Sequence, residues 1–223
     1  MTNLMHSNMT ASSSRHCFIA HTEEQRRQVY RLRYACYRRK GSIDPRPDEQ
    51  FSDAFDQAPN HFSFLVSSTD DQAMATVRVS VVRPDLGWTD APVLHVYGHD
   101  ARLAPIARES FVEASRLCFG PLARRDAFVR LVAHMAALAE MYQVAWLIAC
   151  PRVEHAHVYQ RIFGFQTLAE PRQYFGVNFE TQLLGIRTAD LRAFVRKDRV
   201  MTTAWADALA HLMRASAPAL LAS

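Results

Sequence analysis

The sequence predicts an α+β fold with a mixed, mostly antiparallel central sheet flanked by helices. Runs of β-branched and aromatic residues come first, a strand, helix, strand, helix series follows, and a helical tail ends the chain. A chain of 223 residues, 49% hydrophobic, suits one domain with or without an appendage. We expect residues 1–19 to be a disordered N-terminus, residues 20–187 to form the domain and residues 188–223 to form a C-terminal helical extension.

The first half of the chain predicts one helix followed by two strands. Over residues 23–40 the apolar positions recur at helical spacing, and Gly41 suits the C-terminal cap. Residues 61–66 and 73–82 are rich in Val and Phe and are separated by a polar turn, as in paired strands. Residues 84–110 contain several Pro and Gly and show little periodicity, so we expect them to be mostly irregular.

The second half predicts a crossover between two parallel strands. Residues 110–119 form the third expected strand, and Asp126 is placed to cap a long helix with a continuous apolar face. A buried strand at 144–150 and a helix at about 153–163 follow. This order predicts a βαβ unit with a parallel pair at its centre. The tail, from about 189 to 214, predicts a further helix.

Composition argues against metal and nucleic-acid sites. The four cysteines lie far apart with no CxxC pair, so we expect buried, reduced thiols. The histidines are scattered, and the one tight pair, His155 and His157, lacks partners at ligand spacing, so we expect no metal. The net charge of +4 is a modest basic bias without a nucleic-acid signature. Without a secretory signal or an apolar run of 18 residues, we expect a cytoplasmic protein.

The third expected strand carries unusual polar residues. Glu113, Ser115 and Arg116 lie in its middle, and strand alternation places Glu113 and Ser115 on one face and Arg116 on the other unless a bulge changes the phase. A buried carboxylate costs several kcal/mol unless it is paired or hydrogen-bonded. A structural ion pair between Glu113 and Arg78 is one explanation, and a functional site is the other.

Two resemblances favour the functional site. The order of elements, together with YQRIFGFQ at 159–166, resembles the acyltransferase fold of the Gcn5-related N-acetyltransferase class. That resemblance implies that the two central parallel strands splay apart and admit the pantetheine arm of an acyl donor. Four short motifs also occur in the order found in acyl-homoserine lactone synthases: LRYACY (32–37), DAFD (53–56), TVRV (76–79) and EASR (113–116).

Carried over residue by residue, this second resemblance implies a charged cluster beside the donor channel. Its members would be Arg33, Asp53, Asp56, Arg78, Glu113 and Arg116, with Tyr37 in the aromatic position. A Trp that those synthases have shortly after the first helix is missing here, where the sequence is RRKGSID (38–44). Over residues 20–187 or so, the sequence resembles the long-chain N-acyl amino acid synthases more than it resembles the acyl-homoserine lactone synthases. The former family uses acyl carrier protein thioesters.

The resemblance also implies the nature of the donor. Acetyl-CoA users of this fold hold a pyrophosphate on a Gly-rich loop, whereas GPLARRDAF (120–128) lacks the second Gly. We therefore expect no tightly bound cofactor and the acyl-phosphopantetheine of acyl carrier protein as donor. Arg124 and Arg125 would meet its phosphate or the acidic carrier surface. Phe119 and Tyr159 complete the expected donor-binding set, although Tyr159 is five residues from Gly164, where related enzymes have four.

The expected reaction moves a medium- or long-chain acyl group to the α-amino group of an amino acid. Glu113 is the candidate base, Ser115 would orient a water or the donor, and Arg116 completes the expected catalytic set. Two alternatives remain: an acyl-homoserine lactone synthase that uses S-adenosylmethionine, and a non-catalytic module that binds a carrier protein or a membrane. Peripheral membrane contact through the product or the tail is a further expectation.

Overall fold

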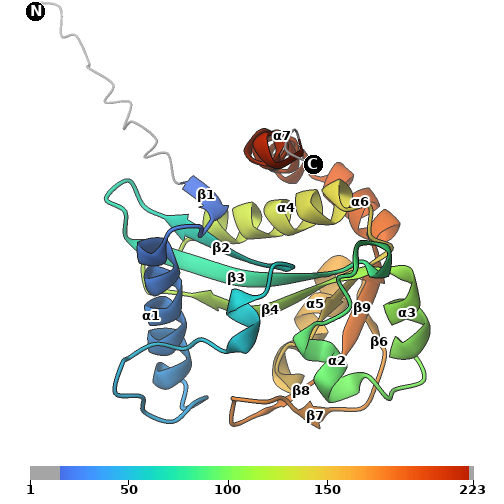
Figure 1. Cartoon of the computed structure of the whole chain (residues 1–223), viewed down its shortest axis with the longest axis horizontal. Helices are drawn as coiled ribbons and strands as arrows, with labels where there is room; N and C mark the ends of the chain where they lie inside the picture. The colour runs from blue at the N-terminus through green and yellow to red at the C-terminus, as the bar shows by residue number, and fades with distance from the viewer. Residues whose placement is uncertain (1–15, 221–223) are drawn as a thin grey trace, which may run out of the picture.

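The computed structural model describes residues 16–220 and is built around one seven-stranded sheet (Figure 1). All neighbouring strands are antiparallel except β4 and β5, which are parallel. In spatial order the strands are β1 (His16–Ile19), β2 (His61–Ser67), β3 (Ala73–Val82), β4 (Phe111–Phe119), β5 (Trp146–Ala149), β9 (Leu184–Arg187) and β6 (Gln166–Thr167). A separate pair consists of β7 (Arg172–Gln173) and β8 (Glu180–Thr181).

Helices cover both faces of the sheet. The α-helices are α1 (Glu23–Arg39), α2 (Pro92–Tyr97), α3 (Leu103–Glu109), α4 (Arg125–Met141), α5 (Ala156–Phe163), α6 (Thr188–Lys197) and α7 (Arg199–Leu220). Short 3-10 turns are η1 (Ala54–Gln57), η2 (Pro84–Leu86) and η3 (Val153–His155). Figure 1 shows α4, α6 and α7 on one face and α1 and α2 on the other. The mixed sheet, the flanking helices and the α4 crossover confirm the predicted fold.

Strand β3 shows why the two faces differ. Val77, Val79 and Val81 belong to the apolar core under α4, whereas Arg78 and Ser80, which alternate with them, lie on the opposite face. All five side chains are buried. The α1 face of the sheet therefore holds buried polar groups, and the α4 face holds the main hydrophobic core.

Strand β4 contains a bulge that changes its phase. Ser115 pairs with Arg78 and Cys118 pairs with Thr76, so β4 has one residue more than β3 across this interval. Arg116 occupies the extra position with φ of 56°, in the left-handed region. The bulge is the phase change that the prediction allowed for, and it turns the side chains of Ser115 and Arg116 to the same face of the sheet, the α1 face.

Strands β4 and β5 pair only up to Ala114, the residue just before the bulge. Their parallel register runs from Phe111 with Trp146 to Ala114 with Ala149 and stops there, although β4 continues to Phe119 beside β3. The gap between the two strands lies next to the bulge. Strand β5 itself ends at Ala149, so β4 extends five residues past the last pair, and the splaying that the fold resemblance implies stays a prediction.

Several local predictions need correction. Residues 84–110 are not mostly irregular, since they contain α2 and α3, which bury Val93, Tyr97, Leu103 and Ile106. Such short helices show too few turns for a periodic pattern. Helix α4 begins at Arg125 with Arg124 at the N-cap, so Asp126 lies in the first turn.

The two ends of the chain also differ from the predictions. The sheet begins at His16, four residues before the expected domain boundary, because β1 pairs with β2. The expected disorder of residues 1–15 lies outside the described residues. The tail forms two helices, because the Asp198 carboxylate accepts hydrogen bonds from the Val200 and Met201 amides and starts α7. None of the helices within residues 16–220 is both long and apolar enough to cross a membrane.

Candidate active site

A 3-10 turn sets the positions of two carboxylates. Asp53 is the N-cap of η1, and its Oδ1 accepts a hydrogen bond from the Phe55 amide at 3.1 Å. Asp56 reaches back and accepts one from the Asp53 amide at 3.0 Å. This reciprocal capping explains why the two Asp residues are three apart, and it holds both carboxylates on the α1 face of the sheet.

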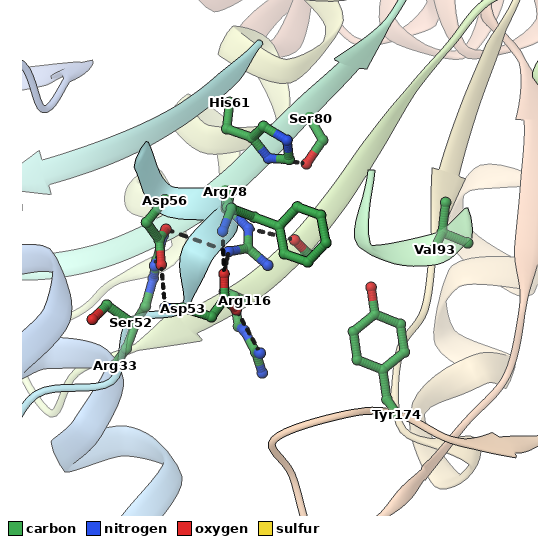
Figure 2. Close-up of polar contacts among 12 residues, drawn as sticks. Arg33, Ser52, Asp53, Asp56, His61, Arg78, Ser80, Val93, Arg116 and Tyr174 are labelled. Atoms are coloured by element: carbon green, nitrogen blue, oxygen red, sulfur yellow. Dashed lines mark hydrogen bonds and ion pairs between the residues drawn. The ribbon is translucent and has the colours of Figure 1, made fainter. Parts of the chain in front are cut away.

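Three arginines from three different elements meet these carboxylates (Figure 2). Arg33 of α1 donates to Asp56 Oδ1 at 2.7 Å. Arg78 of β3 donates to Asp53 Oδ1 at 2.5 Å and lies 3.4 Å from Asp56. Arg116 of β4 donates to Asp53 Oδ2 at 2.9 Å. The five residues form what we call the ion network, which links α1, η1, β3 and β4.

The ion network is mostly buried, and its most exposed side chain, that of Asp53, is 19% exposed. The side chains of Arg33 and Arg78 are 0% exposed and that of Asp56 is 1% exposed. Burial acts to raise the pKa of Asp53, but the charges and hydrogen bonds of Arg78 and Arg116 outweigh it and lower this pKa to about 2. With three guanidinium groups and two carboxylates, the ion network carries one more positive than negative charge.

Glu113 lies close enough to the ion network for Arg78 and Arg116 to act on its charge. The side chain is fully buried, and burial raises its pKa, against the effects of its hydrogen bonds and of both arginines. Its Oε1 accepts a hydrogen bond from the Tyr174 hydroxyl at 2.5 Å, and its Oε2 accepts one from the Val93 amide at 2.9 Å. Glu113 thus receives hydrogen bonds from the α2 side, and the ion pairs found among the described residues include none between Glu113 and Arg78.

A cavity of about 460 Å³ lies at the gap between β4 and β5. Its volume falls within the range of about 300–1,000 Å³ typical of small-molecule sites. One end is polar and lined from α1, the loop after it, the bulge and the segment after β5: Tyr37, Arg39, Lys40, Ser42, Arg116, Arg152 and His155. The other end is apolar and is lined by residues of α4, α5 and α6 and of the turn between α5 and β6: Phe128, Val132, Met135, Phe163, Phe165 and Leu191.

The cavity and the ion network contain most of the residues singled out from the sequence. Tyr37, Ser115, Arg116, Phe119 and Tyr159 line the cavity. Ser115 joins the two sites, because its hydroxyl accepts a hydrogen bond from Arg78 Nε at 3.2 Å while it lines the cavity. Burial raises the pKa of Tyr159 to about 12, so this phenol stays protonated at neutral pH.

Three of the predicted site residues belong neither to the cavity lining nor to the ion network. Glu113, two residues before Ser115 on β4, is buried where its carboxylate accepts hydrogen bonds from Val93 and Tyr174. Arg124 and Arg125 are exposed at the start of α4. They can therefore meet only a group that approaches from solvent.

Sequence reasoning missed several groups around the site. Tyr174 comes from a segment without periodicity, 61 residues from Glu113, so no local pattern signals their contact. Arg152 lies with its guanidinium 3.9 Å from the centre of the Phe179 ring and donates to the Ser42 hydroxyl at 2.5 Å. Its place at the polar end of the cavity follows from tertiary packing.

The cysteines are free thiols, and Cys36, Cys118 and Cys150 line the cavity. Cys17, Cys36 and Cys118 are buried free thiols, whereas Cys150 is partly buried and also free. A hydrogen bond from Cys118 lowers the pKa of Cys36 to about 7. Within the part of the chain that the structure describes, no three His, Cys, Asp or Glu side chains are grouped so as to hold a metal ion.

The ion network predicts a large stability effect for Asp56→Ala. The substitution leaves the buried Arg33 without its carboxylate, and breaking a buried pair costs about 3–5 kcal/mol. Urea denaturation followed by circular dichroism measures the free energy of unfolding. Asp207→Ala, at an exposed position of α7, is the control and should leave the midpoint unchanged. An equal effect of both substitutions would contradict the structural role of the ion network.

The lowered pKa of Asp53 predicts a pH effect on stability. Its folded value of about 2 lies below the ordinary 3.8, so the stabilisation is present above pH 3.8 and is lost as the pH falls through 2. Asp53→Asn removes this titration, and its unfolding free energy should fall less steeply than that of the wild type between these pH values. Asp70→Asn, at an exposed turn, should keep the wild-type slope. Parallel curves for Asp53→Asn and wild type would refute the assignment.

Several solved structures share the fold of this chain. FeeM, described as an N-acyl amino acid synthase from uncultured soil microbes, superposes with a TM-score of 0.68 at 13% identity, over 82% of this chain and 95% of that one. The acyl-homoserine lactone synthase LasI gives 0.58 at 14%, over 79% and 91%. The CoA-dependent acyl-homoserine lactone synthase BjaI gives 0.60 at 15%, over 86% and 98%.

These likenesses establish the fold, and a sequence-family match goes further. No curated protein sequence matches the chain. A family model described as N-acyl amino acid synthase FeeM matches residues 28–187, which include the ion network, Glu113 and almost all of the cavity lining. The chain has an acyltransferase fold, and the family's sequence pattern covers most of the chain. It is therefore an acyltransferase that belongs to the FeeM family of N-acyl amino acid synthases.

Proposed function

We propose that this acyltransferase moves a medium- or long-chain acyl group from the thioester of acyl carrier protein to the α-amino group of an amino acid. The observation that carries the proposal is the cavity between β4 and β5, which is apolar at one end and cationic at the other. An N-acyl amino acid has a matching shape, with an apolar tail and an anionic head. Family membership supports the same class of product.

The gap between the strands suits the thioester. Beyond Ala114 and Ala149 neither strand pairs with the other, so backbone amides of β4 that point away from β3 have no strand partner on the β5 side. Such amides can donate to the oxyanion that forms when the amine attacks the thioester carbonyl. Arg116 lines the same space and adds positive charge.

Glu113 is the proposed base. An amino acid arrives mostly as an ammonium ion and must lose a proton before it attacks, and a carboxyl with a raised pKa is suited to take it. Because Glu113 does not line the cavity, the proton must pass through an intermediate group. Ser115, two residues along β4 and at the cavity wall, or a water that it orients, fits this role.

The donor end is proposed from charge. Arg124 and Arg125 are exposed at the start of α4, just after Phe119 and the Gly120 turn at the end of β4. A phosphopantetheine phosphate or an acidic carrier surface would be attracted to this site. The segment lacks the second Gly that close approach of a pyrophosphate uses, which favours a carrier-bound donor over coenzyme A.

One experiment tests the reaction directly. The pure protein is incubated with long-chain acyl carrier protein, the common amino acids and S-adenosylmethionine, and the products are analysed by mass spectrometry. An N-acyl amino acid supports the proposal and identifies the acceptor. A lactone with methylthioadenosine would instead support the second candidate, a homoserine lactone synthase, which the motif order and the fold of LasI and BjaI favour. Absence of both products from several chain lengths would refute the proposal.

Glu113→Gln should lower kcat by about 100-fold or more, as expected for loss of a general base. Gln keeps the size of the side chain, and its amide oxygen can accept the Val93 hydrogen bond while its NH2 donates to the Tyr174 hydroxyl oxygen, so binding of the donor should change little. Glu109→Gln, at an exposed position on α3, is the matched control and should keep wild-type turnover. An unchanged kcat for Glu113→Gln would rule out Glu113 as the base.

Replacement of Arg124 and Arg125 together by Glu should raise KM for the acyl carrier donor and leave kcat nearly unchanged. The loss should shrink as salt is added, because exposed charges are screened. Arg196 and Lys197, an exposed pair on α6, provide the matched double substitution that should not affect KM. Equal KM values for the two double variants would show that Arg124 and Arg125 do not bind the donor.

A further inference from the structure

Helix α6 lies outside the family match yet lines the cavity. The match ends at residue 187, and α6 begins at Thr188. Leu191, one turn into this helix, lines the apolar end and is 3% exposed. The C-terminal segment therefore contributes to the cavity wall as well as to the outer surface of the domain.

Contacts along α6 hold it against the rest of the domain. The Thr188 amide donates to the Ala145 carbonyl at 3.0 Å, next to the start of β5. Arg192 forms an ion pair with Glu140 of α4. The Phe194 ring lies edge-on to the Phe163 ring of α5, with their centres 5.1 Å apart. Because three neighbouring elements anchor α6, Leu191 has a fixed position in the wall.

Leu191 and the polar end of the cavity lie on opposite faces of the sheet. The polar end is lined by Tyr37 and Ser42 on the α1 face of the sheet, whereas Leu191 lies on the α4 face together with Val132 and Met135. Helix α6 directly follows β9, whose Ile186 pairs with Leu147 at the paired part of β5. An apolar chain that enters from the gap between β4 and β5 and extends into the apolar end thus meets Leu191 on the side away from the reacting carbonyl.

We propose that α6 closes the apolar end of the cavity and that Leu191 limits the length of acyl chain that the enzyme accepts. The inference rests on the proposed acyl transfer for its effect on products, whereas the place of Leu191 in the cavity wall is seen without any ligand. A smaller side chain at this position lengthens the space available, and a larger one shortens it. Each methylene newly buried favours binding about fourfold.

The test compares Leu191→Ala and Leu191→Phe with the wild type. Dodecanoyl- and hexadecanoyl-loaded carrier proteins compete in one reaction, so the product ratio does not depend on the fraction of folded enzyme. Separately, dodecanoate and hexadecanoate displace a fluorescent fatty acid from each protein. Leu212→Ala, which removes an equally buried leucine of α7 that does not line the cavity, controls for loss of stability.

Leu191→Ala should raise the preference for hexadecanoyl over dodecanoyl by about fourfold or more, and Leu191→Phe should lower it by a similar factor. Leu212→Ala should keep the wild-type ratio. Ratios that stay at the wild-type value in both Leu191 variants, or shift equally in Leu212→Ala, overturn the proposal. If none of the proteins forms product, the proposed acyl transfer is refuted. The ratios from the fatty-acid displacement measurement then decide on their own whether Leu191 limits the length of the bound acyl chain.

Discussion

The site depends on the burial of three arginines with two aspartates. Without its partner each charge would cost several kcal/mol to remove from water, so Arg33, Arg78 and Arg116 are stable inside the domain only while the η1 turn supplies Asp53 and Asp56. The requirement acts in both directions. The carboxylates fix the loop after α1, and the arginines fix α1 against β3 and β4. The polar end of the cavity, which Tyr37 of α1 and Arg116 of β4 help to line, takes its position from this arrangement.

The bulge connects the ion network to the cavity. In regular alternation Arg116 would point into the core under α4, where a guanidinium would have no partner. The extra residue turns it to the α1 face, where it binds Asp53 and lies 4.3 Å from the centre of the Phe51 ring. The left-handed conformation costs about 1–2 kcal/mol for a residue with a side chain. The ion pair and the ring contact offset this cost and keep Arg116 at the cavity wall.

The sequence was sufficient for what local patterns and motifs encode. The helix over 23–40, the strands at 61–66 and 73–82 and the parallel crossover follow from periodicity, and the motifs place Asp53 and Asp56 with the arginines. Helices α2 and α3 were missed because they span fewer than three turns. The side of β4 on which Arg116 lies, and the partners of Glu113, depend on a one-residue bulge and on a contact between distant segments. Neither leaves a periodic trace.

The cavity has a practical consequence for handling the protein. A space that is apolar at one end and cationic at the other suits any single-chain amphiphile with an anionic head, whether or not that molecule takes part in the reaction. Anionic detergents used in extraction, and free fatty acids carried over from expression, share this form. Protein freed of such molecules by delipidation is therefore the proper starting material for binding measurements, because a resident amphiphile would mask part of every affinity measured.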